Sequence, residues 1–274
     1  VGRSLRALLS PQAVEVVDTF GNRAIIEASP GSEPHYQEHV IGISRSPIFV
    51  EGVDSNLVTL QSSMRLNPGI IQSTPGQHRH AIELFNPALT ELIGHAVVIA
   101  PGGMRPGQRL SDRDWFVTPR SQPIRAMSES WLELPIDFSF VPGVEAGEKE
   151  LVLDLLIESL AEPIWMRTRT PIELGLDDFE VDLTLRISPD GSDVVIEATM
   201  TNTSDRELRL EATAFAAGYP RQRLPGVVLQ PGQSLSRTTP PFAGAGVQLS
   251  GQRIGIAVID RETRARLNKG VQVP

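Results

Sequence analysis

Short apolar stretches, each closed by Pro, Gly, Asn or Asp, recur along the whole chain and predict β-strands. The clearest alternation of apolar and polar side chains runs over 193–200 and 209–215. A period of two places one set of side chains in a core and the other in water. The best helix candidate, 148–160, is rich in Leu but fits a long strand equally well. The pattern therefore predicts an all-β fold.

The predicted strands fall into two sets of about seven, the number typical of an immunoglobulin-like β-sandwich. The short acidic turn 175–178 separates the two sets and suits a domain junction. We therefore predict one Ig-like sandwich over 56–175 and a second over 176–274. The first set of strands is 57–66, 78–85, 92–100, 113–117, 131–140, 150–158 and 164–173. The second set is 179–188, 193–202, 207–215, 222–229, 233–238, 253–260 and 266–273.

Residues 1–55 fit neither set. The segment 14–26 predicts a hairpin across an Asp-to-Asn turn, and 40–43 with 47–51 predicts a strand pair. Four short strands are too few for an independently stable domain. We expect this β-rich segment to be either the remnant of an upstream domain or an extension that packs on the first sandwich.

An internal repeat supports the division into two sandwiches. The segment 84–92 aligns without gaps on 200–208, and in both a strand runs into Asn, a polar turn, Glu-Leu and another strand. Asn at a strand end starts a turn well, because its side chain bonds to its own main chain. Each half also has a Pro-Gly turn further on, Pro142-Gly143 and Pro231-Gly232, which we expect to correspond.

Composition excludes several classes of protein. The 274 residues carry 25 Lys plus Arg against 33 Asp plus Glu, for a net charge of −8, and 40% are hydrophobic. The apolar content allows packed cores, whereas an acidic chain is a poor nucleic-acid binder. The absence of Cys removes disulfides, thiolate metal sites and Cys nucleophiles. With no apolar run of membrane-spanning length, we expect no membrane insertion, no nucleic-acid partner and no cofactor.

Several motifs make the chain similar to a known class of accessory module. The stretch 82–87 with Gly94, then 115–119, resembles bacterial Ig-like modules of the NEW3 type, and 200–204 with 229–234 resembles them again. Segments 16–22 and 46–52 look like the last strands of the β-sandwich that follows a glycoside hydrolase barrel. The resemblance implies tandem accessory modules, C-terminal to a glycoside hydrolase-like region.

That resemblance implies a non-catalytic role. We expect a spacer or stabilising region of a larger bacterial protein that is secreted, periplasmic or at the cell surface. Its partners would be other domains of the parent chain, and polysaccharide if the region binds sugar. Neither a nucleophile elbow, nor a phosphate-binding loop, nor a zinc-protease helix motif occurs in the sequence. We therefore expect no catalytic residues and no enzymatic activity in this region.

Histidine is the first residue type to consider for a metal site. His78 and His80 are two positions apart on a predicted strand and share a face, and His95 lies on a strand that could neighbour it. Three converging imidazoles would bind zinc or nickel. The alternative, which we favour, is that these are solvent-exposed histidines at the mouth of a strand.

An acidic cluster marks the proposed junction. It comprises Asp177, Asp178, Glu180 and Asp182, with Asp205 and Glu207 within reach. Calcium prefers six to eight oxygen ligands, so such a cluster could stiffen a junction by binding it. The alternative, which we favour, is a solvated hinge whose alternate residues face water.

Tryptophan is the residue type expected in a sugar-binding platform. Trp115, Trp131 and Trp165 all lie in the first predicted sandwich, with Trp115 and Trp131 as the candidate ligand-binding residues. Large aromatic side chains more often fill the core between two sheets. A carbohydrate-binding module, the main alternative function, requires exposed rather than buried Trp.

Catalysis and strand addition would each need a distinct structural feature. An enzyme would need a polar pocket with converging carboxylates. Recruitment of a partner strand would need a long unpaired edge strand without Pro.

Overall fold

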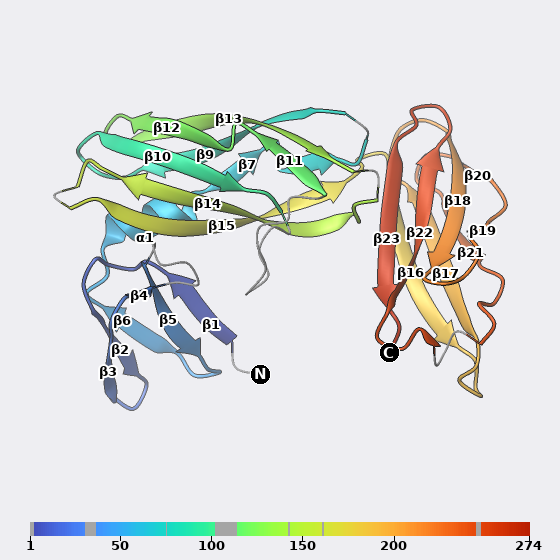
Figure 1. Ribbon diagram of the computed structural model, residues 1–274, viewed down its shortest axis with the longest axis horizontal. Helices are drawn as coiled ribbons and strands as arrows, with labels where there is room; N and C mark the ends of the chain where they lie inside the picture. The colour runs from blue at the N-terminus through green and yellow to red at the C-terminus, as the bar shows by residue number, and fades with distance from the viewer. Residues whose placement is uncertain are drawn as a thin grey trace. The chain divides into compact units, whose positions relative to one another are not determined.

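A computed structural model describes residues 3–30, 37–74, 76–101, 114–141, 143–160, 162–244 and 248–274. The fold is all-β, as predicted, with several β-sheets consistent with tandem sandwiches and one short helix within these ranges (Figure 1). The chain divides into two compact units. Unit 1 comprises 1–69, 79–138 and 149–172, and unit 2 comprises 70–78, 139–148 and 173–274. No helix in the described ranges is long and apolar enough to cross a membrane.

The N-terminal part of unit 1 forms two three-stranded sheets. Their small shared core is built from Leu9, Val14 and Ile41, with Val16, Ile26, Ile48 and Val50 packed around it. The hairpin predicted over 14–26 is present, and Asp18 closes its turn by accepting hydrogen bonds from the backbone of Phe20 and Asn22. One sheet has the order β1 (Arg3–Ala7), β5 (Gln37–Ile43), β4 (Ser29–Pro30), and the other β3 (Arg23–Ile26), β2 (Val14–Asp18), β6 (Ile48–Glu51).

The predicted pairing of 40–43 with 47–51 is wrong. Strand β5 pairs with β1 and β4, whereas β6 pairs with β2, so the two segments lie in different sheets. Adjacent strands often form hairpins, but here the first strands of the chain take up both positions. The partner of each strand is thus set by segments far away in the sequence, so the pattern of residues within 40–51 does not predict it.

Two sheets build the first sandwich, with Leu84, Phe138, Leu153 and Ile124 fully buried between them. One sheet has the order β12 (Ser121–Ala126), β10 (Leu92–Ile99), β14 (Gly147–Ile157), β15 (Ile164–Gly175), β8 (Ile70–Gln72). The other has the order β11 (Trp115–Thr118), β13 (Ser130–Phe140), β9 (His78–Asn86), β7 (Arg65–Asn67). The Leu-rich segment 148–160 thus forms a strand, β14, and not a helix.

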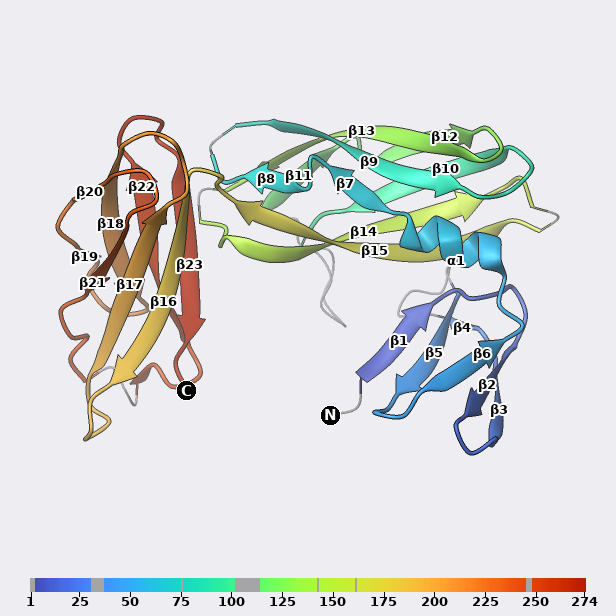
Figure 2. The same ribbon diagram turned by 180° about the vertical axis from the view of Figure 1, so that it is seen from behind.

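The strand predicted over 57–66 is instead the helix α1 (Ser55–Ser62). Asp54 caps it, because its Oδ1 accepts hydrogen bonds from the N–H groups of Asn56 and Leu57 at 2.9 and 3.2 Å. Leu57 and Leu60 fall one turn apart and are buried. Thr168 Oγ1 of β15 donates to the Gln61 carbonyl at 3.0 Å, which places α1 against that strand (Figure 2).

The second sandwich lies wholly within unit 2. One sheet has the order β16 (Phe179–Ile187), β17 (Val194–Asn202), β21 (Ser234–Thr238). The other has the order β19 (Gln222–Arg223), β18 (Leu208–Ala216), β22 (Arg253–Asp260), β23 (Arg266–Gln272), with β20 (Val227–Leu229) also paired to β18. Phe179, Met200, Leu210 and Val258 fill the core between the sheets.

Strand β16 is an edge strand that pairs only with β17 among the described strands. It has nine residues and contains neither Pro nor Gly. At the other edge of the same sheet, β21 has five residues and is followed by Pro240 and Pro241, a common protection against strand addition.

Candidate functional site

The two candidate tryptophans lie in different environments. Trp115 is 4% exposed and meets the ring of Phe138 edge-on at 6.2 Å, so it belongs to the core. Trp131 is 49% exposed on β13, and its ring packs against Phe85 with centroids 5.5 Å apart. The Arg65 guanidinium lies 4.4 Å from the centroid of the Trp131 ring, which is a cation–π contact. Trp131 is therefore the aromatic surface that a sugar could reach.

Glu83 anchors the cation beside Trp131. Its carboxylate accepts hydrogen bonds from Arg65 Nε at 2.5 Å and Asn67 Nδ2 at 2.6 Å. The hydrogen bond from Asn67 and then that from Arg65 keep the pKa of Glu83 below its usual value, so it stays ionised. Strand register explains the arrangement, because Arg65 lies opposite Glu83 in the β7–β9 pair.

The three candidate histidines do not converge, and the expectation that they are solvent-exposed holds for His95 but is wrong for His80, which is buried. His78 Nε2 lies 2.9 Å from the Thr74 carbonyl and its ring stacks on Phe140, whereas His80 is buried with Nδ1 2.9 Å from the Pro68 carbonyl. His95 lies on β10, in the other sheet of the sandwich, on an exposed position 3.7 Å from a Glu158 oxygen. No group of three metal-binding side chains occurs in the described parts of the chain.

The acidic cluster at the junction divides among separate partners. Asp177 accepts a hydrogen bond from Gln72 Nε2 at 2.6 Å, and Asp182 lies 3.4 Å from Lys269 Nζ. Asp178 binds Arg206, and Glu207 binds Arg209 at 3.1 Å. These carboxylates therefore do not turn toward one shared cation position.

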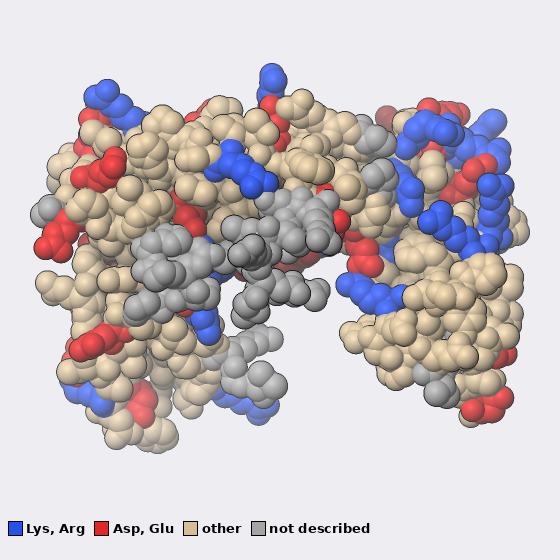
Figure 3. Space-filling model, viewed as in Figure 1, with Lys and Arg blue, Asp and Glu red and all other residues tan. Residues whose placement is uncertain are grey.

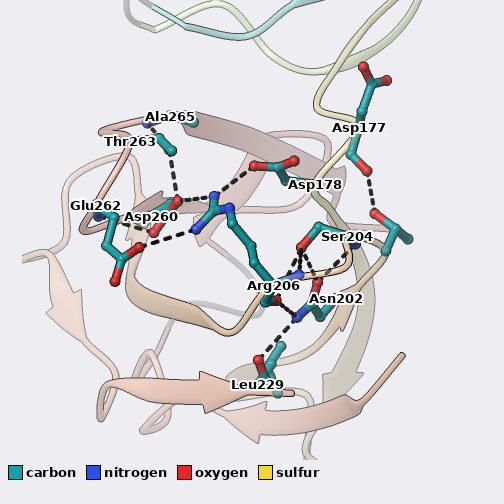
Figure 4. Close-up of polar contacts among 11 residues, drawn as sticks. Asp177, Asp178, Asn202, Ser204, Arg206, Leu229, Asp260, Glu262, Thr263 and Ala265 are labelled. Carbon is teal, nitrogen blue, oxygen red and sulfur yellow. Dashed lines mark hydrogen bonds and ion pairs between the residues drawn. The ribbon is translucent and has the colours of Figure 1, made fainter. Parts of the chain in front are cut away.

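Arg206 is the centre of a dense polar cluster in unit 2, which the sequence patterns did not predict (Figure 4). Its Nη2 lies 2.7 Å from Asp178 Oδ2 and 2.6 Å from Asp260 Oδ2, and its Nη1 lies 3.5 Å from Glu262. The Asp260 side chain is 0% exposed, and it also accepts from Thr263 Oγ1 at 2.8 Å and the Glu262 N–H at 3.1 Å. We call Arg206, Asp178, Asp260 and Glu262 the Arg206 cluster.

The charge state of the Arg206 cluster follows from its contacts. Burial alone would raise the pKa of Asp260, but the hydrogen bonds from Arg206, Thr263 and the Glu262 backbone outweigh burial and lower it. The hydrogen bonds that Arg206 donates to Asp260 and Asp178 raise its pKa above the usual value for arginine. Arg206 and Asp260 therefore stay charged at neutral pH, and the cluster joins the loops that carry them.

Two buried asparagines close equivalent turns at the ends of β9 and β17. Asn86 Nδ2 donates to the carbonyls of Thr90, Ala126 and Met127, and Asn202 Nδ2 donates to those of Arg206 and Leu229. The Oδ1 atoms accept from the N–H two residues on, at 3.1 Å in the first case and 2.9 Å in the second. We call residues 86–90 and 202–206 the asparagine turns.

The expected match of the two Pro-Gly turns is wrong. The carbonyl groups that the two asparagines bind show which residues correspond. Asn202 binds the Leu229 carbonyl, and Gly232 follows Leu229 by three residues. Asn86 binds the Ala126 carbonyl, and Glu129 follows Ala126 by three residues. Both have positive φ, 72° for Gly232 and 49° for Glu129. Glu129, not Gly143, therefore occupies the place of Gly232; Pro142 lies outside the described residues.

We expect substitution of either turn asparagine by Ala to destabilise its own sandwich by about 2–3 kcal/mol, because each change leaves buried carbonyl groups without donors. Urea unfolding of Asn86→Ala and Asn202→Ala, monitored by fluorescence and circular dichroism, measures the loss. Asn22→Ala is the control, because Asn22 is exposed, and it should cost less than about 1 kcal/mol. Equal losses at all three positions would contradict the role of the asparagine turns.

Comparison with known proteins gives distant structural matches alone. No protein family and no curated protein matches the chain. A Pseudomonas aeruginosa CupB2 chaperone matches with 12% identity and a TM-score of 0.26, over 72% of this chain and 93% of the chaperone. A Salmonella alpha-2-macroglobulin mutant matches with 14% identity and a TM-score of 0.38, over 99% of this chain and 22% of that protein.

An enzyme is also among the matches. The Eisenbergiella tayi GH2 beta-galacturonidase, bound to galacturonate, has 12% identity and a TM-score of 0.27, over 100% of this chain and 44% of the enzyme. All these likenesses are to β-sandwich-containing proteins, and none carries an activity over to this chain.

Proposed function

We propose that this chain is a non-catalytic accessory region of a larger exported bacterial protein, in which tandem Ig-like sandwiches act as spacer or stabilising modules. A glycan-degrading or cell-surface protein is the proposed context. In this proposal the matching asparagine turns reflect duplication of one sandwich. Other domains of the parent chain are the proposed partners.

The observation that carries the proposal is the pairing of charged groups. The buried carboxylates Asp260, Glu83 and Asp154 each bind an arginine of the same chain. A hollow of about 490 Å³ beside β16 is lined by exposed carboxylates at alternate strand positions, including Glu180 and Asp182. A general acid or base requires a carboxyl group whose pKa is shifted toward neutral and which faces a substrate. The paired arrangement suits a scaffold better than a catalyst.

A hydrolysis assay tests the non-catalytic role. We expect the purified chain to release no product above buffer from a panel of chromogenic glycosides and esters. Turnover that disappears in Glu180→Gln or Glu83→Gln, with the same unfolding curve, would overturn the proposal. Turnover that persists in both variants would do so as well once a second purification route gives the same rate.

Carbohydrate binding at Trp131 is the second candidate function, favoured by the half-exposed ring. We expect a polysaccharide ligand to quench tryptophan fluorescence and Trp131→Ala to abolish the response, because Trp115 is buried and Trp165 is less exposed than Trp131; a response that persists in Trp131→Ala would assign the binding to Trp165 instead. Phe116→Ala is the matched control, since Phe116 is 52% exposed on the neighbouring strand β11. A flat titration across glucans, xylans, pectins and chitosan would remove this candidate and leave the scaffold role.

A further inference from the structure

A cavity of about 260 Å³ on the outer face of the β18–β22–β23 sheet differs in its charge from the hollow beside β16. Arg221 and Arg266 line it, and no acidic side chain among the described residues does. By contrast, the hollow beside β16 is lined by four carboxylates, Glu173, Asp177, Glu180 and Asp182. In a chain with a net charge of −8, a cavity whose charged lining residues are both basic is unexpected. Figure 3, which views this face, shows basic side chains gathered over the upper half of the sandwich.

The two arginines of this cavity are available to a ligand. Most arginines in the described ranges bind a carboxylate, as Arg253 binds Glu145 and Arg261 binds Glu211. Neither Arg221 nor Arg266 has such a partner among the described residues. The Arg266 side chain is held in place by one hydrogen bond, from its Nε to Asn268 Oδ1 at 2.9 Å. This bond uses Nε alone, so the two Nη groups of the guanidinium can donate to a ligand.

Strand register brings the cavity's other groups together. Thr213 of β18 lies opposite Ala257 of β22, which lies opposite Asn268 of β23, so a hydroxyl, a methyl and an amide form one row across the sheet. In the next row Phe215 lies opposite Gly255. A Cβ on Gly255 would be 2.8 Å from the Phe215 ring, so the missing side chain makes room for that ring in the cavity wall.

We propose that this cavity binds a small oxyanion, and that a single-ring sugar acid is the ligand that fits it. Guanidinium groups bind carboxylates through paired N–H donors, and the Thr213 hydroxyl adds a hydrogen-bonding group for a ligand hydroxyl, while Asn268 holds Arg266 in place. The Phe215 ring offers an apolar face against which a sugar ring packs. A volume of about 260 Å³ is at the small end for ligand sites and limits the ligand to one ring. The inference is independent of the proposed accessory function.

Titration of the ¹⁵N-labelled chain with sodium glucuronate tests the site. We expect saturable shifts of amide signals in β18, β22 and β23, and no saturable shifts with glucose. Arg221→Gln and Arg266→Gln should each weaken binding about tenfold, because each removes one charged donor. Arg237→Gln is the matched control, since Arg237 lies on β21 in the other sheet and should leave binding unchanged.

Sodium sulfate distinguishes the two sources of oxyanion. If sulfate binds with the same sensitivity to Arg221→Gln and glucuronate binds no tighter, the ligand is an inorganic oxyanion; tighter glucuronate binding identifies a sugar acid. The proposal is overturned if neither anion saturates the shifts, or if Arg237→Gln weakens binding as much as Arg221→Gln. Arg221 is exposed and outside the strands, so its variant should retain the unfolding curve of the natural chain.

Discussion

Replacement of Gly94 by Ala is expected to unfold the first sandwich. The added Cβ would lie 1.8 Å from the Leu156 carbonyl oxygen, far inside contact distance. Gly94 sits in β10, which is paired on both sides, to Ile124 of β12 and Ile157 of β14, so neither neighbour can move without breaking its ladder. We expect a loss of about 4 kcal/mol or more, the upper end for single substitutions.

The two backbones also meet beside Gly94. The Ile93 carbonyl accepts hydrogen bonds from both the Glu158 and the Ser159 N–H groups, at 2.9 and 3.3 Å, directly after β14 ends. Glycine is the residue expected in a strand where another backbone approaches this closely.

Scanning calorimetry of Gly94→Ala measures the effect, with Gly42→Ala as the matched control. Gly42 also lies in a paired strand, but a Cβ there would meet no atom within 4 Å. The control should be neutral or stabilising by about 0.5 kcal/mol, because Ala loses less backbone entropy on folding. A Gly94→Ala chain that melts like the control would show that the β10–β14 packing is described wrongly.

Arg206→Met is expected to destabilise the second sandwich by about 3 kcal/mol at pH 7. The substitution leaves the fully buried Asp260 carboxylate without its cation, and an unpaired buried charge is more costly than the pair itself. Asp178→Asn is the graded comparison. Asp178 is 38% exposed, so we expect its variant to lose less than about 1 kcal/mol in the same urea titration.

The pH dependence of Arg206→Met has a defined sign. In the natural chain the pKa of Asp260 is below its unfolded value, so its contribution is complete above about pH 4 and is lost as the pH falls through the folded pKa. Without Arg206, fewer hydrogen bonds offset the effect of burial, so the pKa of Asp260 in the folded variant is higher than in the natural chain. Protonation of Asp260 at low pH then removes the cost of burying an unpaired charge. The stability difference between the two chains should therefore shrink from pH 7 to pH 4. A difference that is constant with pH would exclude Asp260 as the cause.

Alternation predicted the strands well because each has one face in a core and one in water. Strand β17 (Val194–Asn202) alternates buried and half-buried positions over its whole length, and its predicted range of 193–202 is confirmed within one residue. The helix over 55–62 was not predicted, because its pattern of apolar positions is too short to show a helical period. It is short, and its buried Leu57 and Leu60 do not by themselves establish a helical period, so the Asp54 cap was the clearest distinguishing signal.

The candidate sites were harder to predict because they depend on long-range pairing. Asp260 and Arg206 are 54 positions apart, and only the sheet order brings their loops together. Histidines 78 and 80 do share a face, as the two-residue period requires, but His95 belongs to the opposite sheet. Exposure of Trp131 and burial of Trp115 likewise follow from strand alternation on β13 and β11, which could have been read from the flanking residues.

The two asparagine turns differ in how much of each loop can be exchanged. Each loop is enclosed between an asparagine amide and a carbonyl that the amide binds, at Thr90 in the first turn and at Arg206 in the second. In the second turn the Arg206 side chain also binds Asp260, so a foreign loop there would remove the cation of a buried carboxylate. In the first turn Leu89 is 83% exposed, so the segment 87–89 is the place where a foreign peptide could be displayed with the sandwich core unchanged.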